Sequence, residues 1–354
     1  MASSVGEWRA VPLPFHAKTM ASDPSLSSSF GPDEIPGYER LSYALPREDD
    51  GALWATLVRK CGEDATTPGF DRPAVLYVHG FCDYFFQTHL CDAIESAGYR
   101  FYALELRRYG RSIAPGNRPN QARDISDYFL EIDWAIDFIT KRHPYIAGAV
   151  AHSTGGLILS HYFKEPSRYF QGSDHLHRVR CLVLNSPFLK FNLPKKETAL
   201  VKLAALSGGV LPYYKLPQKI SGCYGKTLHK SQLGEWDYNL NYKPLYGFPF
   251  YPMWFRMITR AHAEIAHGLG VPLPIFALRS SRSQFPNDPP GPDDFFADTV
   301  LNVNDIRELA PLLGPRVDPC VIENGMHDLY LSNEISRATA LRETLHFIGT
   351  HGSS

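Results

Sequence analysis

The sequence has few cysteines and no recognisable metal-binding or disulfide pattern. Six cysteines are scattered over 354 residues, without a CxxC pair and without histidines clustered at metal-ligand spacing. In a chain of this length, isolated cysteines are typical of reduced thiols rather than of a disulfide framework. We therefore expect neither a metal site nor structural disulfides.

The sequence also lacks an excess of charge of one sign. It has 36 lysines and arginines against 37 aspartates and glutamates, and no long run of either sign. Proteins that bind nucleic acids or membrane surfaces usually carry clustered basic residues. The composition therefore predicts no nucleic-acid partner and no role at a membrane surface, and it leaves the oligomeric state open.

Long hydrophobic runs are missing as well. No stretch of about 18 apolar residues occurs, so the sequence contains no candidate transmembrane helix. Near the N-terminus, Glu7 and Arg9 lie where a signal peptide would have its apolar segment. We therefore expect a soluble, cytoplasmic protein.

Short apolar segments alternate with helical patterns over most of the chain. Hydrophobic residues make up 44% of the sequence, which is enough for one large α/β domain with an insertion. Because strand and helix alternate, the sequence predicts an α/β fold with a mostly parallel, eight-stranded sheet and helices on both faces. The predicted strands are residues 38–45, 52–60, 74–80, 100–106, 145–151, 181–187, 273–280 and 318–324.

Two segments interrupt this alternation. Residues 1–36 are rich in serine and proline and are predicted to form an N-terminal arm. Residues 188–270 contain an aromatic tract and many prolines, which we expect to keep helices short. This insertion follows the sixth strand, and open α/β sheets bind ligands at the carboxyl ends of their strands. It is predicted to form a cap, or lid, over a core made of residues 37–187 and 271–354.

Ser153 lies in the stretch "AHSTGG", between a predicted strand and a predicted helix. Its neighbours two positions away, Ala151 and Gly155, are small enough to permit a sharp turn. Such a turn exposes the serine Oγ at a helix N-terminus, where negative charge is stabilised. The pattern A-x-S-x-G differs from the usual G-x-S-x-G. By itself it is compatible with a nucleophile and also with a glycine-rich turn that packs closely.

An earlier predicted strand ends in Val78-His79-Gly80-Phe81 and can bring a backbone amide to the same place. The amides of Phe81 and Thr154 would together form a two-donor oxyanion hole, worth ~3–4 kcal/mol per donor in the transition state. His79 is interpreted as a structural residue that supports this loop through hydrogen bonds.

His327 follows the last predicted strand, on a loop before the final helix. This position is at the carboxyl edge of the sheet, where Ser153 is also expected, so His327 is the candidate general base; the alternative is an ordinary surface histidine. No carboxylate follows the strand at residues 273–280 directly. Asp298 is the preferred acid because it lies where the chain must return to the sheet edge. Asp294 and Asp293 remain alternatives, and for all three the other explanation is a solvated acidic loop.

Three aromatic residues of the insertion, Trp236, Tyr246 and Trp254, are candidates for the wall of a substrate cavity. They can equally form the core of the cap. An aromatic, proline-rich cap favours a hydrophobic substrate of modest size.

The run "VLYVHGF…YRFYALELRRYGRS…AHSTGG…LVLNSPF…GMHD" resembles the α/β-hydrolase superfamily, in particular its serine aminopeptidase-like and monoacylglycerol-lipase-like branch. The resemblance covers roughly residues 39–350, and the motifs occur in the order of that family. It implies the α/β-hydrolase fold, the same oxyanion amides of Phe81 and Thr154, and a cap at residues 188–270 that shapes substrate choice. The sequence departs from the family at Ala151 and in the late position of the acid.

We therefore expect a serine hydrolase that cleaves an ester or lactone of a hydrophobic small molecule through an acyl-enzyme on Ser153. This chemistry requires no metal or organic cofactor. Acyl transfer, thioester cleavage or peptide hydrolysis by the same residues stays open. A binding protein that keeps the fold without catalysis is the remaining alternative.

Overall fold

The computed structural model describes residues 29–62, 71–164, 175–217 and 220–352. They form one nine-stranded sheet with the strand order β1-β2-β3-β5-β4-β6-β7-β8-β9. The strands are β1 (Gly31–Pro32), β2 (Tyr38–Glu48), β3 (Gly51–Lys60), β4 (Ala74–Val78), β5 (Arg100–Glu105), β6 (Ile146–His152), β7 (Leu182–Asn185), β8 (Ile275–Ser280) and β9 (Val317–Ile322).

All eight predicted strands are present, and the ninth is the two-residue β1. This short strand pairs antiparallel with β2 and belongs to the segment predicted as an arm. Two residues are too few to show a hydrophobic period, so β1 could not be predicted from the sequence. Most of the predicted arm, residues 1–28, lies outside the described residues.

The sheet is antiparallel at one side and parallel elsewhere. Strands β2 and β3 form a hairpin, and β3 pairs antiparallel with β5. From β5 through β4, β6, β7 and β8 to β9 every pairing is parallel. The carboxyl ends of these six strands therefore meet at one edge, and the loops that follow β4, β6 and β9 begin there.

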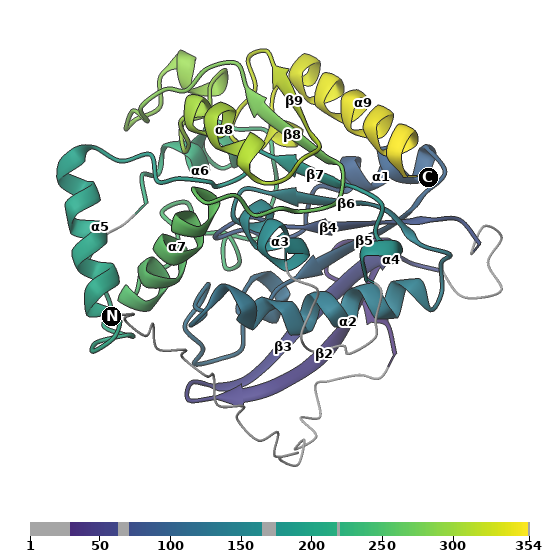
Figure 1. Ribbon diagram of the computed structural model, residues 1–354, viewed down its shortest axis with the longest axis horizontal. Coiled ribbons are helices and arrows are strands. Elements are labelled where there is room, and N and C mark those ends of the chain that lie inside the picture. The colour runs from purple at the N-terminus through teal and green to yellow at the C-terminus, as the bar shows by residue number, and fades with distance from the viewer. Residues whose placement is uncertain (1–28, 63–70, 165–174, 218–219, 353–354) are drawn as a thin grey trace, which may run out of the picture.

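Helices cover both faces of the sheet (Figure 1). Helices α1 (Thr88–Ser96) and α9 (Glu334–His351) pack on one face, and α2 (Phe129–Thr140) and α3 (Thr154–Lys164) pack on the other. Every residue of β4, β6 and β7 is buried, as expected for parallel strands covered on both sides.

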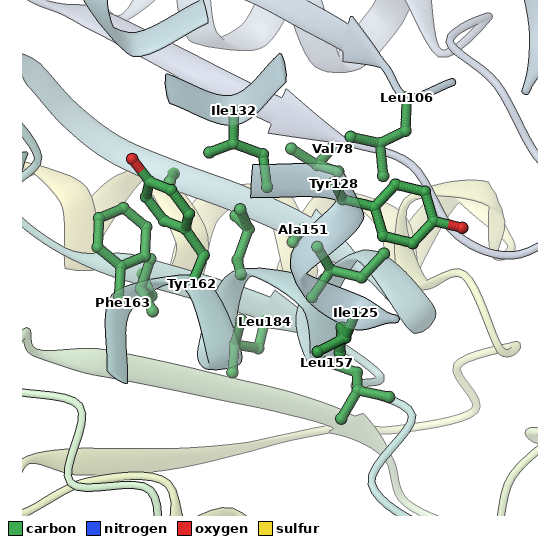
Figure 2. Close-up of a cluster of buried hydrophobic side chains, with 14 of the residues drawn as sticks. Val78, Leu106, Ile125, Tyr128, Ile132, Ala151, Leu157, Tyr162, Phe163 and Leu184 are labelled. Carbon is green, nitrogen blue, oxygen red and sulfur yellow. The ribbon is translucent and has the colours of Figure 1, made fainter. Parts of the chain in front are cut away.

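Alternate residues of β4 enter two different cores. Leu76 and Val78 belong to the cluster on the side of α2 and α3, whereas Val75 and Tyr77 belong to the cluster on the side of α1 and α9. Figure 2 shows the first cluster, in which side chains of the strands meet those of the two helices. Its labelled residues are Val78, Leu106, Ile125, Tyr128, Ile132, Ala151, Leu157, Tyr162, Phe163 and Leu184.

The segment predicted as the cap contains α5 (Lys195–Ser207), α6 (Cys223–Leu228) and α7 (Pro252–Ile265), between β7 and β8. Helices α5 and α7 lie side by side at one end of the molecule (Figure 1). Their 13 and 14 residues are longer than the prolines of this segment led us to expect. Pro252 does not break α7 because it occupies the first turn, where a helix needs no backbone N–H from it.

The other α-helices of the described residues are α4 (His175–Arg178) and α8 (Val303–Leu309). No helix among the described residues is both long enough and apolar enough to span a membrane. All six cysteines are free thiols.

Candidate active site

Ser153 lies on the turn between β6 and α3 and has φ +50°, a left-handed conformation that is strained for a residue with a side chain. Its backbone N–H donates to the carbonyl of Asn185 in β7 (2.9 Å). A Cβ atom added at Gly155 would lie 2.4 Å from the carbonyl oxygen of His79. The second glycine of the motif is therefore required, since α3 begins in direct contact with the end of β4.

The Oγ of Ser153 lies 3.0 Å from Nε2 of His327, and Nδ1 of the same imidazole lies 3.0 Å from Oδ2 of Asp298. The other carboxylate oxygen of Asp298 accepts the backbone N–H groups of Val300 (2.8 Å) and Leu301 (2.7 Å). All three members are buried, at 6%, 3% and 0% exposure in the order Ser153, His327 and Asp298. A hydroxyl, an imidazole and a carboxylate in this order match the geometry that serine hydrolases use for a nucleophile, a base and an orienting acid.

The two alternative acids do not contact His327. Asp294 is buried but accepts hydrogen bonds from the side chains of Gln284 and Asn287. Asp293 is exposed and pairs with Arg282. The excursion after β8 returns to the sheet edge only at Asp298, whose backbone N–H and C=O bond to Arg282 and Gln284.

The oxyanion candidates Phe81 and Thr154 line the same cavity as Ser153. Within the described part of the chain, neither backbone amide donates to an acceptor. Thr154 opens α3, so its N–H is one of those that a helix leaves unpaired. A Cβ at Gly80 would lie 3.2 Å from the Cβ of Ser153, so the loop that carries Phe81 packs directly on the serine.

His79 supports that loop. Its Nε2 accepts the N–H of Leu106 (3.1 Å), which leaves Nδ1–H to donate to the carbonyl of Gly80 (2.8 Å). Burial lowers the pKa of His79 to about 4, so the imidazole is neutral at physiological pH. The structure therefore gives His79 a scaffolding position, as interpreted from the sequence.

Ser153 and His327 open into a cavity of about 490 Å³. Its wall is mostly aromatic and aliphatic and comes from both the core and the segment between β7 and β8. Trp254 lies in this wall, as predicted. Phe188 and Phe191, which the sequence analysis did not select, also line it. Their position directly after β7, at the carboxyl edge of the sheet, was a usable signal.

Trp236 and Tyr246 do not line this cavity, which corrects their predicted position. The indole N–H of Trp236 donates to the carbonyl of Leu331 (2.9 Å), and its ring stacks on His89. Tyr246 is 45% exposed and lies over Gly222, where a Cβ would meet its ring. Trp236 attaches the segment between β7 and β8 to the core, and Tyr246 packs within that segment.

A second buried polar cluster lies beside Ser153 and His327. One ring nitrogen of His152 and carboxylate oxygens of Asp83 and Asp328 lie within 4.8 Å of one another. The ammonium of Lys243 lies 2.6 Å from Asp83, and Asp328 accepts the side-chain amide of Asn185 (2.7 Å). Burial lowers the pKa of His152. These residue types can bind metal ions. Here the carboxylates of Asp83 and Asp328 already accept hydrogen bonds from N–H groups, and Asp83 also pairs with a lysine, so groups of the protein satisfy them.

The family model described as "Serine aminopeptidase, S33" matches residues 71–265, which is more than half of the chain. A soluble variant of monoglyceride lipase from Saccharomyces cerevisiae, in complex with a substrate analog, has a TM-score of 0.59 at 12% identity, over 96% of this chain and 99% of that one. Monoacylglycerol lipase from Paleococcus ferrophilus has a TM-score of 0.57 at 15% identity, over 80% and 97%.

The identity to these solved structures is low, so the likeness establishes the architecture and not the substrate. The sheet order, the turn at Ser153 and the matched family model agree with one another. The chain belongs to the serine aminopeptidase S33 family and has the α/β-hydrolase fold.

Proposed function

We propose that this protein is a serine hydrolase that cleaves an ester or lactone bond of a hydrophobic small molecule through an acyl-enzyme on Ser153. The observation that carries the proposal is the continuous hydrogen-bonded series from Asp298 through His327 to Ser153, which ends in a largely apolar cavity. A nucleophile, a base and an orienting acid in hydrogen-bond contact are what acyl transfer to serine requires.

His327 acts through Nε2, which takes the proton of Ser153 as Oγ attacks the acyl carbon. The amides of Phe81 and Thr154 bind the oxyanion of the tetrahedral intermediate. The imidazolium then gives its proton to the leaving oxygen, and the alcohol departs. A water molecule repeats the sequence on the acyl-enzyme and releases the acid, while Asp298 holds His327 in the required tautomer.

The substrate class follows from the cavity. A volume of about 490 Å³ is in the range that holds a small organic ligand, and the aromatic wall favours apolar groups. Two of the similar folds are lipases of monoglycerides, which is consistent with a lipid-like ester. Residues 188–270 act as the cap in this proposal, and the unpaired thiols favour the reducing environment of the cytoplasm.

Hydrolysis is tested against acyl transfer by product analysis. Wild type and Ser153→Ala are incubated with a panel of esters, thioesters, lactones and aminoacyl amides, with and without an added alcohol as competing nucleophile. The proposal predicts turnover of esters or lactones with the free acid as product, and none by Ser153→Ala. If the main product were the ester of the added alcohol, the activity would be acyl transfer and not hydrolysis. If only amides were turned over, the protein would be a peptidase.

A further inference from the structure

Lys243 is a lysine of the segment between α6 and α7 that is buried against the loop after β4. Its side chain reaches the cavity with 6% exposure, and Nζ lies 2.6 Å from Oδ1 of Asp83. Three aromatic rings surround the ammonium at 5.6 to 5.8 Å, those of Phe86, Tyr224 and Tyr238. Removing both charges from water is costly, so this pair is poor evidence for stability alone.

Asp83 closes the loop that carries Phe81. While Oδ1 faces Lys243, Oδ2 accepts the backbone N–H of Gly80 (3.3 Å). Between them, Cys82 has φ +51°, a conformation that costs free energy for a residue with a side chain. The amide of Phe81 therefore lies in a strained turn, and the carboxylate of Asp83, the last residue of this turn, bonds back to Gly80, the first.

The charge of Asp83 depends on its neighbours. Burial raises its pKa, but the charge and hydrogen bond of Lys243, together with His152 and His79, hold the pKa below its ordinary value. Removal of the ammonium would leave burial and the nearby Asp328 to favour the neutral acid, which is a weaker acceptor for Gly80. The titratable groups around this carboxylate are Lys243, His152, His79, Asp328, Cys82, Tyr77, Tyr224 and Tyr238.

We propose that Lys243 is a positioning residue for the oxyanion hole: its contact with Asp83 fixes the turn from Gly80 to Asp83 and thereby aims the amide of Phe81. This inference rests on the proposed function. It links the insertion to the chemistry, because docking of the segment that carries Lys243 adds a contact that aims the oxyanion donor, beside the support from His79.

The test compares Lys243→Met and Lys243→Arg with wild type, and Lys230→Met is the matched control, since Lys230 pairs with Asp237 at the surface. Ester turnover from roughly pH 5 to 9 and the affinity for a boronic acid inhibitor are measured. We expect Lys243→Met to lose about 10- to 100-fold in kcat, with little change in KM and a matching loss of inhibitor affinity. Because loss of the ammonium should raise the pKa of Asp83 in this variant, its activity should fall more steeply than that of wild type as the pH decreases. Arginine should restore most of the activity.

If Lys243→Met does not fold, two double variants that remove both the lysine and the carboxylate charge still test the proposal. Lys243→Met with Asp83→Asn retains an acceptor for Gly80, whereas Lys243→Met with Asp83→Leu removes it. The first should exceed the second by about tenfold in kcat. Equal kcat values in the two, or a loss confined to KM in Lys243→Met, would overturn the inference. Covalent labelling of wild-type Ser153 tests the proposed function separately. If Ser153 is not labelled, both proposals fail. If Ser153 is labelled but the Lys243 variants have the kcat of wild type, only the role proposed for Lys243 fails.

Discussion

The Nε2 atom of His327 lies 3.0 Å from the Oγ of Ser153, although 174 positions separate the two residues in the chain. The contact exists because both residues follow parallel strands, β9 and β6, whose carboxyl ends lie at the same edge of the sheet. The chemistry of the site is therefore a product of strand order, and it can be tested residue by residue.

Asp298→Asn should reduce kcat about 10³- to 10⁴-fold without unfolding the protein. Asparagine keeps the shape of the side chain, but its amide can donate to Nδ1 and so favours the wrong tautomer of His327. Asp293→Asn is the matched control, since that exposed carboxylate pairs with Arg282 and does not contact the site. Steady-state kinetics on one ester settles the assignment. If Asp293→Asn lost activity and Asp298→Asn kept it, the orienting acid would be Asp293 and not Asp298.

Gly155→Ala should destabilise the protein by roughly 2 kcal/mol or more and lower kcat, because the new methyl group would lie 2.4 Å from the carbonyl of His79. The carbonyl belongs to the backbone and cannot turn aside. Gly349→Ala in α9 is the control: nothing lies within 4 Å of its Cβ position, and the change should stabilise by about 0.5–1 kcal/mol. Denaturant unfolding measures both. Similar effects at the two glycines would contradict the close approach of α3 to β4.

The stability of the protein should decline between about pH 6.5 and pH 4. Burial lowers the pKa values of His79 and His262 to about 4, below the value of an unfolded histidine. The unfolded chain then binds more protons than the folded one in this window, so acid favours unfolding. We expect a loss of roughly 2 kcal/mol per histidine from pH 7 to pH 5, measured by urea unfolding.

His262→Phe provides the comparison for this pH dependence. Phenylalanine suits a site next to the rings of Phe188 and Phe191, and it removes one of the buried histidines whose pKa is lowered. The decline between pH 7 and pH 5 should therefore become shallower. A curve as steep as that of wild type would mean that other groups produce the decline.

Trp254→Leu should lower kcat/KM about tenfold for long-chain esters and less for acetate esters, because Trp254 forms part of the cavity wall. Trp236→Leu should leave this chain-length preference unchanged, since Trp236 is bonded to the backbone of Leu331 outside the cavity. The preference is measured on esters of increasing acyl length. If Trp236→Leu changes it and Trp254→Leu does not, the cavity is not the acyl site.

The sequence was most informative where backbone geometry restricts residue type. The turn at Ser153 requires small neighbours, and the position of His327 after the last strand follows from the alternation of strand and helix. Asp298 was separable from Asp293 and Asp294 only by the argument that the chain must return to the sheet edge, and the contact to His327 agrees with that choice.

The segment between β7 and β8 was the least predictable region. Trp254, in the cavity wall, lies on α7, where buried residues recur every three to four positions, whereas Trp236 lies in an irregular stretch and docks on the core. The period places Trp254 on a buried helix face, but it does not indicate whether that face meets the cavity or the core of the segment. Lys243 is a single lysine with no surrounding motif. Its partner Asp83 is 160 positions away, and only the three-dimensional arrangement reveals the pair.

The central claim is that Ser153 is a nucleophile activated by His327, and covalent labelling tests it most directly. The protein is treated with a fluorophosphonate, and intact and peptide mass spectra locate the adduct. Ser153→Ala, His327→Ala and Ser207→Ala are treated in parallel, and Ser207 is the control because it ends α5 and does not line the cavity. We predict one adduct per chain on Ser153 in wild type and in Ser207→Ala, none in Ser153→Ala, and strongly slowed labelling in His327→Ala. An unlabelled wild type, or an adduct that persists in Ser153→Ala, would contradict the account.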